Sequence, residues 1–141
     1  MSGPAIDWRV HFAASPEAVW QAWTTDAGRQ LFWAETSRGD EGGFELSFLN
    51  GEALRVEIVE ARPPELLAFR YFGGSTVTLD LSPDGRGGCD LRLREEGAPD
   101  PVGNHAGWVS VLLACKAAVD FGVDLRSHDP GRSWDEGFVD V

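Results

Sequence analysis

A long apolar stretch near the end of the chain, residues 107–124, limits the fold more than any other feature of the sequence. At about 100° of rotation per residue, most of its apolar side chains share one face of a helix, while Lys116, Asp120 and Asp124 lie on the opposite side. This apolar face is wider than a surface helix needs. We therefore expect the chain to wrap around this helix, and a later segment to cover part of it. The shared face holds Trp108, Val111, Leu112, Cys115, Ala118, Val119 and Gly122, extended on one side by Ala114, Phe121 and Leu125.

Most of the preceding chain alternates between apolar and polar residues, which is the pattern of strands with one buried face. After a first such run at residues 6–12, Ser15-Pro16 and Thr25-Asp26 predict the starts of two short helices, because these residues cap helix N-termini or suit the first turn. Short turns such as Asn50-Gly51 separate the later runs and predict an antiparallel meander. The five later runs are residues 44–48, 54–58, 67–71, 77–81 and 89–94, and residues 97–103 are predicted to be a loop before the long helix.

This order of elements predicts an α+β fold in which a curved antiparallel β-sheet wraps around the long C-terminal helix, with two short helices after the first strand. A curved sheet must cover its inner face, and the long helix is the apolar element available to do so. A helix lying in the mouth of such a sheet leaves space for a pocket between the two. We expect residues 1–126 to form this domain.

Composition narrows the range of partners. The chain of 141 residues carries a formal net charge of −11, which disfavours nucleic acid and anionic membrane surfaces as partners. No apolar run is long enough to span a membrane, and the first residues do not resemble a signal peptide. Cys89 and Cys115 lie far apart without metal-ligand spacing, so we expect both thiols to be reduced and the protein to be cytoplasmic.

Four short stretches share a pattern with a known superfamily: residues 13–24 (AASPEAVWQAWT), 31–33 (LFW), 59–67 (VEARPPELL) and the helix start Gly107-Trp108. Over residues 6–123 the chain resembles the START-like helix-grip (SRPBCC) superfamily, in the branch named after the activator of the heat-shock chaperone ATPase (AHSA-type). The resemblance implies a helix-grip fold with a pocket for a hydrophobic ligand. The activator that gives the branch its name has an additional domain that engages the chaperone, for which we expect no room in this chain.

The candidate ligand-binding residues combine the inward side of the predicted strands with the gripped face of the helix. Trp and Tyr suit a pocket wall because each offers an apolar body and one polar group. For each candidate, plain packing in the core is as good an interpretation as ligand contact. The candidates are Trp33, Phe48, Phe69, Tyr71, Trp108, Leu112 and Cys115.

The sequence supports no catalytic or metal-binding set. Glu35 follows Leu31-Phe32-Trp33 and could face the pocket mouth, but a solvated loop carboxylate explains it better. His11, His105 and His128 are scattered: His11 lies on the wet side of its strand, His105 in the loop before the long helix, and His128 after that helix. The acidic segment 39–43 (GDEGG) would repel phosphate, and we expect no cofactor.

Three functions from different classes follow. The first is non-enzymatic binding of a small hydrophobic ligand between the curved sheet and the C-terminal helix. The second is a cyclase- or hydrolase-like enzyme acting on an aromatic or cyclic substrate, which would need at least two convergent ionisable groups in the cavity. The third is a chaperone-accessory or other protein-interaction module, which would need a filled core and an exposed apolar patch. A homodimer is compatible with each of these.

The last residues, 127–141, carry two apolar rings in an otherwise polar and acidic segment. Trp134 and Phe138 would both be exposed to water in a free tail, at a cost of a few kcal/mol relative to burial. Pro130 and Gly131 should stop the helix before this segment. We therefore predict an ordered tail that packs back on a domain surface near the helices, the alternative being a disordered acidic terminus.

Overall fold

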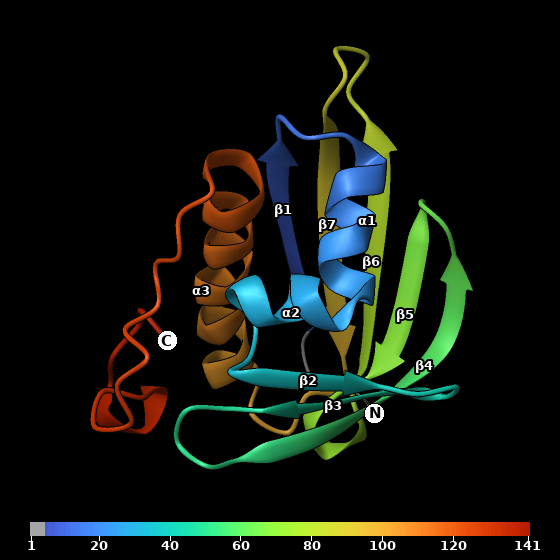
Figure 1. Ribbon diagram of the computed structural model, residues 1–141. Coiled ribbons are helices and arrows are strands. Elements are labelled where there is room, and N and C mark those ends of the chain that lie inside the picture. Colours follow the sequence, from blue (N-terminus) through green and yellow to red (C-terminus); the bar gives the residue numbers. More distant parts are fainter. Residues whose placement is uncertain (1–4) are drawn as a thin grey trace.

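The computed structural model describes residues 5–141, which fold into a seven-stranded antiparallel sheet covered on one face by helices (Figure 1). The strands follow the order β1-β7-β6-β5-β4-β3-β2, so β1 and β2 form the two edges. In chain order the elements are β1 (Ile6–Phe12), α1 (Pro16–Thr24), α2 (Asp26–Phe32), β2 (Thr36–Gly39), β3 (Gly43–Ser47), β4 (Ala53–Arg62), β5 (Leu66–Arg70), the short 3-10 turn η1 (Phe72–Gly74), β6 (Thr76–Pro83), β7 (Cys89–Glu96), α3 (Pro101–Phe121) and the 3-10 turn η2 (Trp134–Glu136).

Helices α1 and α2 begin where the sequence predicted. The Ser15 hydroxyl accepts a hydrogen bond from the Ala18 N–H at 3.2 Å, and the Thr25 hydroxyl accepts one from the Gly28 N–H at 3.0 Å. These caps satisfy backbone donors that have no partner in the first turn of a helix. Helix α2 then ends at Phe32 with Trp33 as its C-cap residue, which fixes the position of the Trp33 ring over the sheet.

The long helix α3 begins six residues earlier than predicted, so part of the expected loop 97–103 is helical. Its start has a polar signal: the Asp100 carboxylate accepts a hydrogen bond from the Gly103 N–H at 3.1 Å, and Pro101 occupies the first helical position. The apolar pattern begins only about two turns later, near Trp108, and therefore predicted a start that is too late. At the other end Gly122, with φ of 65°, terminates the helix in the left-handed conformation.

The sheet also contains an edge strand that the sequence did not predict. Strand β2 pairs with β3 through Thr36 to Gly39, so six strands follow the two short helices instead of five. Its four residues are too few and too polar to show an alternating pattern. Ile58 was expected on the inward side of β4, but the register of β4 against β5 shifts there and leaves Ile58 partly exposed.

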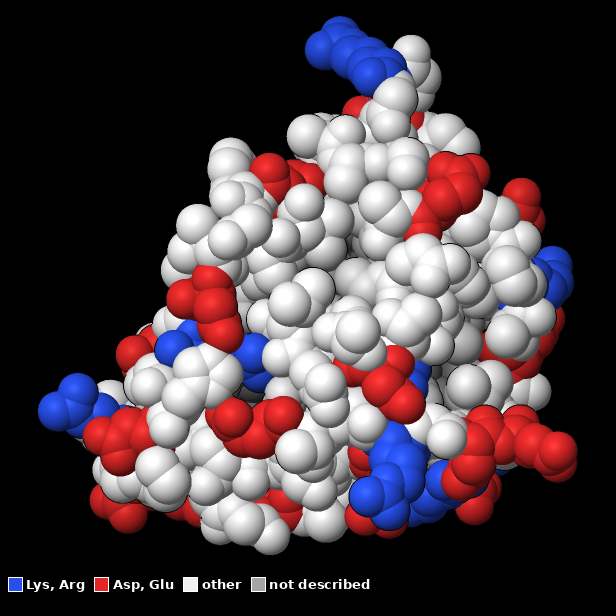
Figure 2. Space-filling model, viewed as in Figure 1, with Lys and Arg blue, Asp and Glu red and all other residues white. Residues whose placement is uncertain are grey.

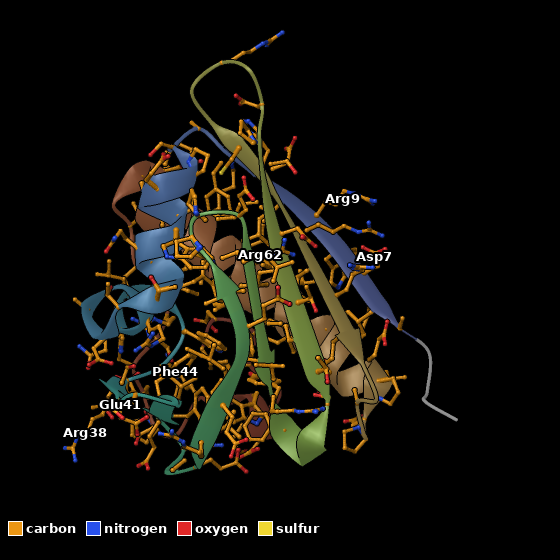
Figure 3. The ribbon with its side chains drawn as sticks, turned by 90° about the vertical axis from the view of Figure 1, so that its right-hand side faces the viewer. Asp7, Arg9, Arg38, Glu41, Phe44 and Arg62 are labelled. Atoms are coloured by element: carbon orange, nitrogen blue, oxygen red, sulfur yellow. The ribbon has the colours of Figure 1, made fainter. Side chains whose placement is uncertain are left out.

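The core lies between the concave face of the sheet and the three helices. Trp23, Phe32 and Phe44 are fully buried there, and Figure 3 shows Phe44 pointing inward while Asp7 and Arg9 project from β1 on the outer face. Two α3 residues join the helix to the start of the chain. The Asp120 carboxylate accepts hydrogen bonds from the Ala13 and Ala14 N–H groups, and Lys116 donates to the His11 carbonyl.

Part of the outer side of α3 is exposed, although the width of the apolar face predicted that a later segment would cover it. Phe121 is 70% exposed and Leu113 is 51% exposed, and Leu125 also faces solvent. Most of the wide face is buried by β1, α1 and α2, but the last segment runs back along α3 without covering these three side chains (Figure 1). Within residues 5–141, no helix is long and apolar enough to cross a membrane.

Candidate functional site

A cavity of about 510 Å³ opens between the first half of α3, the β3–β4 hairpin, the turn after β5 and the segment that follows α3. This volume is within the range of roughly 300–1,000 Å³ typical of small-molecule sites. The walls are mainly aromatic and aliphatic, with a few polar groups. The lining residues include Trp33, Glu35, Phe48, Glu52, Tyr71, Phe72, Asp100, Asn104, Gly107, Trp108, Ser110, Val111, Arg126, Trp134, Phe138, Val139 and Val141.

Four of the seven predicted ligand-binding residues line this cavity: Trp33, Phe48, Tyr71 and Trp108. The other three, Phe69, Leu112 and Cys115, are buried in the core and do not line it. Phe69 lies in β5, and Leu112 and Cys115 lie in α3, and each of the three is packed in the hydrophobic core. Burial also raises the pKa of the Cys115 thiol, which is consistent with a neutral core side chain.

The inner wall is a cluster of three rings held on three different elements. The rings of Tyr71 and Trp108 lie 4.8 Å apart between centroids, and each lies 6.1 Å from the ring of Trp33. Separations of this size are favourable for aromatic pairs. The cluster therefore offers a preformed apolar surface to any molecule that enters the cavity.

The Tyr71 hydroxyl makes no hydrogen bond to any residue in the described range 5–141. Burial raises the pKa of this hydroxyl, so it stays protonated at neutral pH. The indole N–H of Trp33 lies close enough to the Tyr71 oxygen to offset part of that rise. The contact does not reach hydrogen-bond geometry, however, and the buried Trp33 nitrogen has no partner.

Glu95 is a functional candidate that the sequence reasoning missed. Its side chain is completely buried behind the ring cluster, where one carboxyl oxygen accepts hydrogen bonds from Trp108 Nε1 and Asn104 Nδ2, both at 3.0 Å. The other oxygen accepts a hydrogen bond from the Ser75 hydroxyl at 2.5 Å. The signal was present in the sequence, because Glu95 continues the inward alternation of Cys89, Leu91 and Leu93 in β7. Its contacts show that it positions Trp108 and Asn104 within the wall.

The segment after α3 supplies the outer wall of the cavity. It is anchored by Arg126, whose guanidinium is only 8% exposed and donates hydrogen bonds to the Ala34 and Gln30 carbonyls as well as to Asp124. Further along, the ring of Trp134 packs edge-on against Phe48 at 5.3 Å. Trp134 therefore contacts the β3–β4 hairpin instead of the helices near which the sequence reasoning placed it.

A second anchor of the same segment is His128, which bridges two carboxylates. Its Nε2 lies 2.6 Å from Asp124 and its Nδ1 lies 2.8 Å from Glu35. The hydrogen bond to Asp124, with a further contribution from Glu35, raises the pKa of His128. Burial raises the pKa of Asp124, but hydrogen bonds from Arg126 and His128 outweigh this effect and lower the pKa to about 2. Glu35 thus lines the cavity, as considered from the sequence, but with a structural partner.

The other two histidines do not line the cavity, and they lie in different elements of the fold. His11 pairs with Asp84 at 2.8 Å at the opposite end of the sheet. His105 lies inside α3, not in a loop as predicted, and its ring stacks on Trp8 of β1 at 4.4 Å. Among residues 5–141, no three His, Cys, Asp or Glu side chains are grouped as metal ligands would be. Cys89 and Cys115 are both free and buried.

Acidic groups dominate the polar part of the cavity. Glu35, Glu52 and Asp100 all contribute to the lining, whereas Arg126 is the lining cation and already contacts Asp124. The wider surface on this side carries more acidic than basic groups (Figure 2). An anionic ligand would therefore meet unfavourable electrostatics at this site.

A family model described as activator of Hsp90 ATPase homolog 1-like protein (AHSA1) matches residues 13–119. The chain belongs to the AHSA1 family. This confirms the AHSA-type branch of the START-like superfamily expected from the sequence, and the α+β helix-grip fold is confirmed as well. No curated protein matches the chain in sequence.

Solved structures with the AHSA1-family fold superpose over most of the chain. The Aha1 dimer from Colwellia psychrerythraea has a TM-score of 0.75 at 21% identity, covering 85% of this chain and 98% of that chain. SSP2350 from Staphylococcus saprophyticus has a TM-score of 0.74 at 22% identity, covering 85% and 94%. DynU16, from the dynemicin biosynthetic locus, has a TM-score of 0.74 at 17% identity, covering 85% and 48%. At these identities the likeness establishes the fold alone.

Proposed function

We propose that this AHSA1-family chain binds a small hydrophobic molecule in the cavity between the curved sheet and α3, without catalysing a reaction. The observation that carries the proposal is the cavity itself, about 510 Å³ with an aromatic inner wall. An apolar cleft of this size with an aromatic wall is typical of small-molecule binding sites, which supports the proposal. We propose Trp33, Phe48, Tyr71 and Trp108 as the predicted residues that contact it.

The alternatives receive less support from the site. An enzyme of the cyclase or hydrolase type would need an acid–base pair converging on the cavity. Of the lining carboxylates, Glu35 pairs with His128 and Asp100 caps α3, which leaves Glu52 as a single carboxylate instead of an acid–base pair. Glu95 lies behind the lining and accepts hydrogen bonds from three donors. A neutral Tyr71 hydroxyl is a hydrogen-bond donor and not a base. The chaperone-accessory alternative rests on the family description, whereas the cavity favours a ligand.

Filling the cavity should abolish ligand binding without harming the fold. Gly107 lines the cavity from the middle of α3, and a Cβ added there would meet open space. We expect Gly107→Phe to weaken binding of the apolar fluorescent probe N-phenyl-1-naphthylamine at least tenfold, because the new ring occupies its site. The melting temperature should be unchanged or slightly higher, since a glycine inside a helix costs about 0.5–1 kcal/mol.

The control for this variant is Leu113→Phe, a bulky replacement on the exposed side of the same helix. Its probe affinity should equal that of the wild type. Equal binding by Gly107→Phe and Leu113→Phe would show that the probe binds elsewhere, for example on the exposed apolar side of α3. A wild-type protein that binds no apolar probe would contradict the proposed function directly.

We also propose that two copies of the chain associate through the exposed apolar side of α3, and that the protein works in the cytoplasm. The first proposal is supported by Leu113 and Phe121, which expose large apolar side chains on one helix, and by the Colwellia psychrerythraea relative, which was solved as a dimer. The cytoplasmic location is supported by the two free thiols.

The association can be tested by sedimentation velocity, which should find a dimer that Leu113→Glu dissociates. A monomer at all concentrations, with or without this substitution, would refute the association.

A further inference from the structure

We propose that the molecule bound in the cavity is an uncharged aromatic compound with an oxygen acceptor, such as the carbonyl of an aryl ketone, and that this oxygen receives a hydrogen bond from the Tyr71 hydroxyl. The inference rests on the proposed function and adds the chemical class of the ligand. It follows from three properties of the cavity: which donors are already used, how the Tyr71 proton is directed, and which charges surround the site.

Three donor groups of the lining are already engaged within the protein, whereas the hydroxyls of Tyr71 and Ser110 and the indole N–H groups of Trp33 and Trp134 have no acceptor among residues 5–141. The Trp108 indole N–H and the Asn104 amide both donate to Glu95 at 3.0 Å. The Arg126 guanidinium donates to two backbone carbonyls and to Asp124. The Tyr71 hydroxyl, in contrast, has no acceptor among residues 5–141, although it stands in the inner wall beside Trp108. The Tyr71 oxygen is accessible from the cavity, because the enclosed side-chain polar atoms without a partner among residues 5–141 are those of Trp23 and Trp33. A ligand in the cavity can therefore accept the Tyr71 hydrogen bond.

The neighbouring Trp33 determines how Tyr71 uses its hydroxyl. The Trp33 N–H is buried, has no hydrogen-bond partner and lies near the Tyr71 oxygen. An indole N–H is a donor only, so a short movement that brings the two groups together makes the Tyr71 oxygen an acceptor. The Tyr71 proton is then directed away from Trp33, toward the cavity. A ligand oxygen at that point would accept this proton, so that hydrogen bonds run from Trp33 to Tyr71 and from Tyr71 to the ligand.

The charges in the lining exclude an anionic oxygen group. Glu35, Glu52 and Asp100 line the cavity, and Glu95 lies directly behind the Trp108 ring. The Arg126 guanidinium already uses four of its five N–H donors on Asp124 and two backbone carbonyls, so its charge is paired within the protein. A carboxylate would thus be repelled, whereas a ketone presents the same acceptor oxygen without the charge. The flanking rings of Trp33, Tyr71 and Trp108 favour an aromatic body.

A matched set of three naphthalenes tests the inference by isothermal titration calorimetry. The probes are 2-acetylnaphthalene, 2-isopropenylnaphthalene, in which a CH₂ group replaces the carbonyl oxygen, and 2-naphthoate. We expect Tyr71→Phe to weaken binding of the ketone about fivefold to tenfold, as expected for the loss of one hydrogen bond. Binding of the alkene should change less than twofold, because it cannot accept this bond. Wild-type protein should bind 2-naphthoate more weakly than the ketone.

Ser110→Ala removes another hydroxyl of the same cavity wall and tests whether that group, instead of Tyr71, contacts the ketone oxygen. Ser82→Ala is the control that should leave the ketone affinity unchanged, because this hydroxyl lies at an exposed position of β6 outside the cavity lining. Unchanged ketone binding in Tyr71→Phe, or a loss that appears instead in Ser110→Ala, would overturn the inference while the proposed function stands. Tighter binding of 2-naphthoate than of the ketone would overturn it as well. If wild-type protein binds none of the three, the proposed function fails and the inference fails with it.

Discussion

Replacing Glu95 with leucine is expected to lower the free energy of unfolding by about 3 kcal/mol. The substitution leaves two buried donors, the Trp108 indole and the Ser75 hydroxyl, and the partly buried Asn104 amide without an acceptor. Each unpaired buried group costs about 1–3 kcal/mol, and the apolar gain from leucine offsets only part of the sum. Urea denaturation followed by circular dichroism would measure the loss.

Glu95→Gln is the matched control, because its carbonyl oxygen can still accept from Trp108 and Asn104. Its amide would face the Ser75 hydroxyl, which can turn to accept, so we expect a loss of about 1 kcal/mol. If Glu95→Leu were as stable as the wild type, the three hydrogen bonds would not hold the wall in place. The positioning role assigned to Glu95 would then be wrong.

Removing residues 127–141 is expected to destabilise the protein by about 2 kcal/mol, lowering the melting temperature by roughly 6–8 °C. The truncation takes away the His128 bridge to Glu35 and the packing of Trp134 on Phe48, and it exposes one wall of the cavity. This prediction expresses our proposal that residues 1–126 form the domain and that the tail packs on it. Differential scanning calorimetry would measure the shift.

Trp134→Ala in the full-length chain separates the contribution of the ring from that of the rest of the tail. Trp134 is only 38% exposed, so we expect this single change to account for about half of the loss on truncation. A truncated protein that melts at the same temperature as the full chain would mean that the tail adds no stability. Such a result would favour the alternative that residues 127–141 form a disordered terminus.

The fold was predictable because local signals agreed with the long-range pattern. Ser15 and Thr25 mark helix starts by direct side-chain hydrogen bonds, and alternation along β1 and β7 identifies the inward face. Apolar spacing alone does not indicate the start of α3, because that start is marked by the polar cap residue Asp100. Strand β2 carries no local signal, since it is an edge element specified by its partner β3.

The candidate site was predictable only in part, because strand alternation gives the face of a sheet and not the depth of cover above it. Phe69 and Tyr71 share one face of the chain after β4, yet Phe69 lies beneath the helices and Tyr71 in the cavity. Which of these two side chains faces the cavity depends on where α2 ends and where α3 begins. The chemistry at Glu95 was missed because a carboxylate at an inward position is rare, and the alternation was not followed one step further.

The wall formed by the last segment has a consequence for how relatives of this protein can diverge. The stretch that matches the family ends at residue 119, whereas Arg126, Trp134 and Phe138 all lie beyond it. The larger part of the cavity is therefore built from the common scaffold, and a smaller part from a short appendage after α3. Mutations in the appendage can reshape the binding site without passing through unstable intermediates of the core. Selection can thus explore new ligands by exchanging about fifteen residues while the inherited scaffold stays intact.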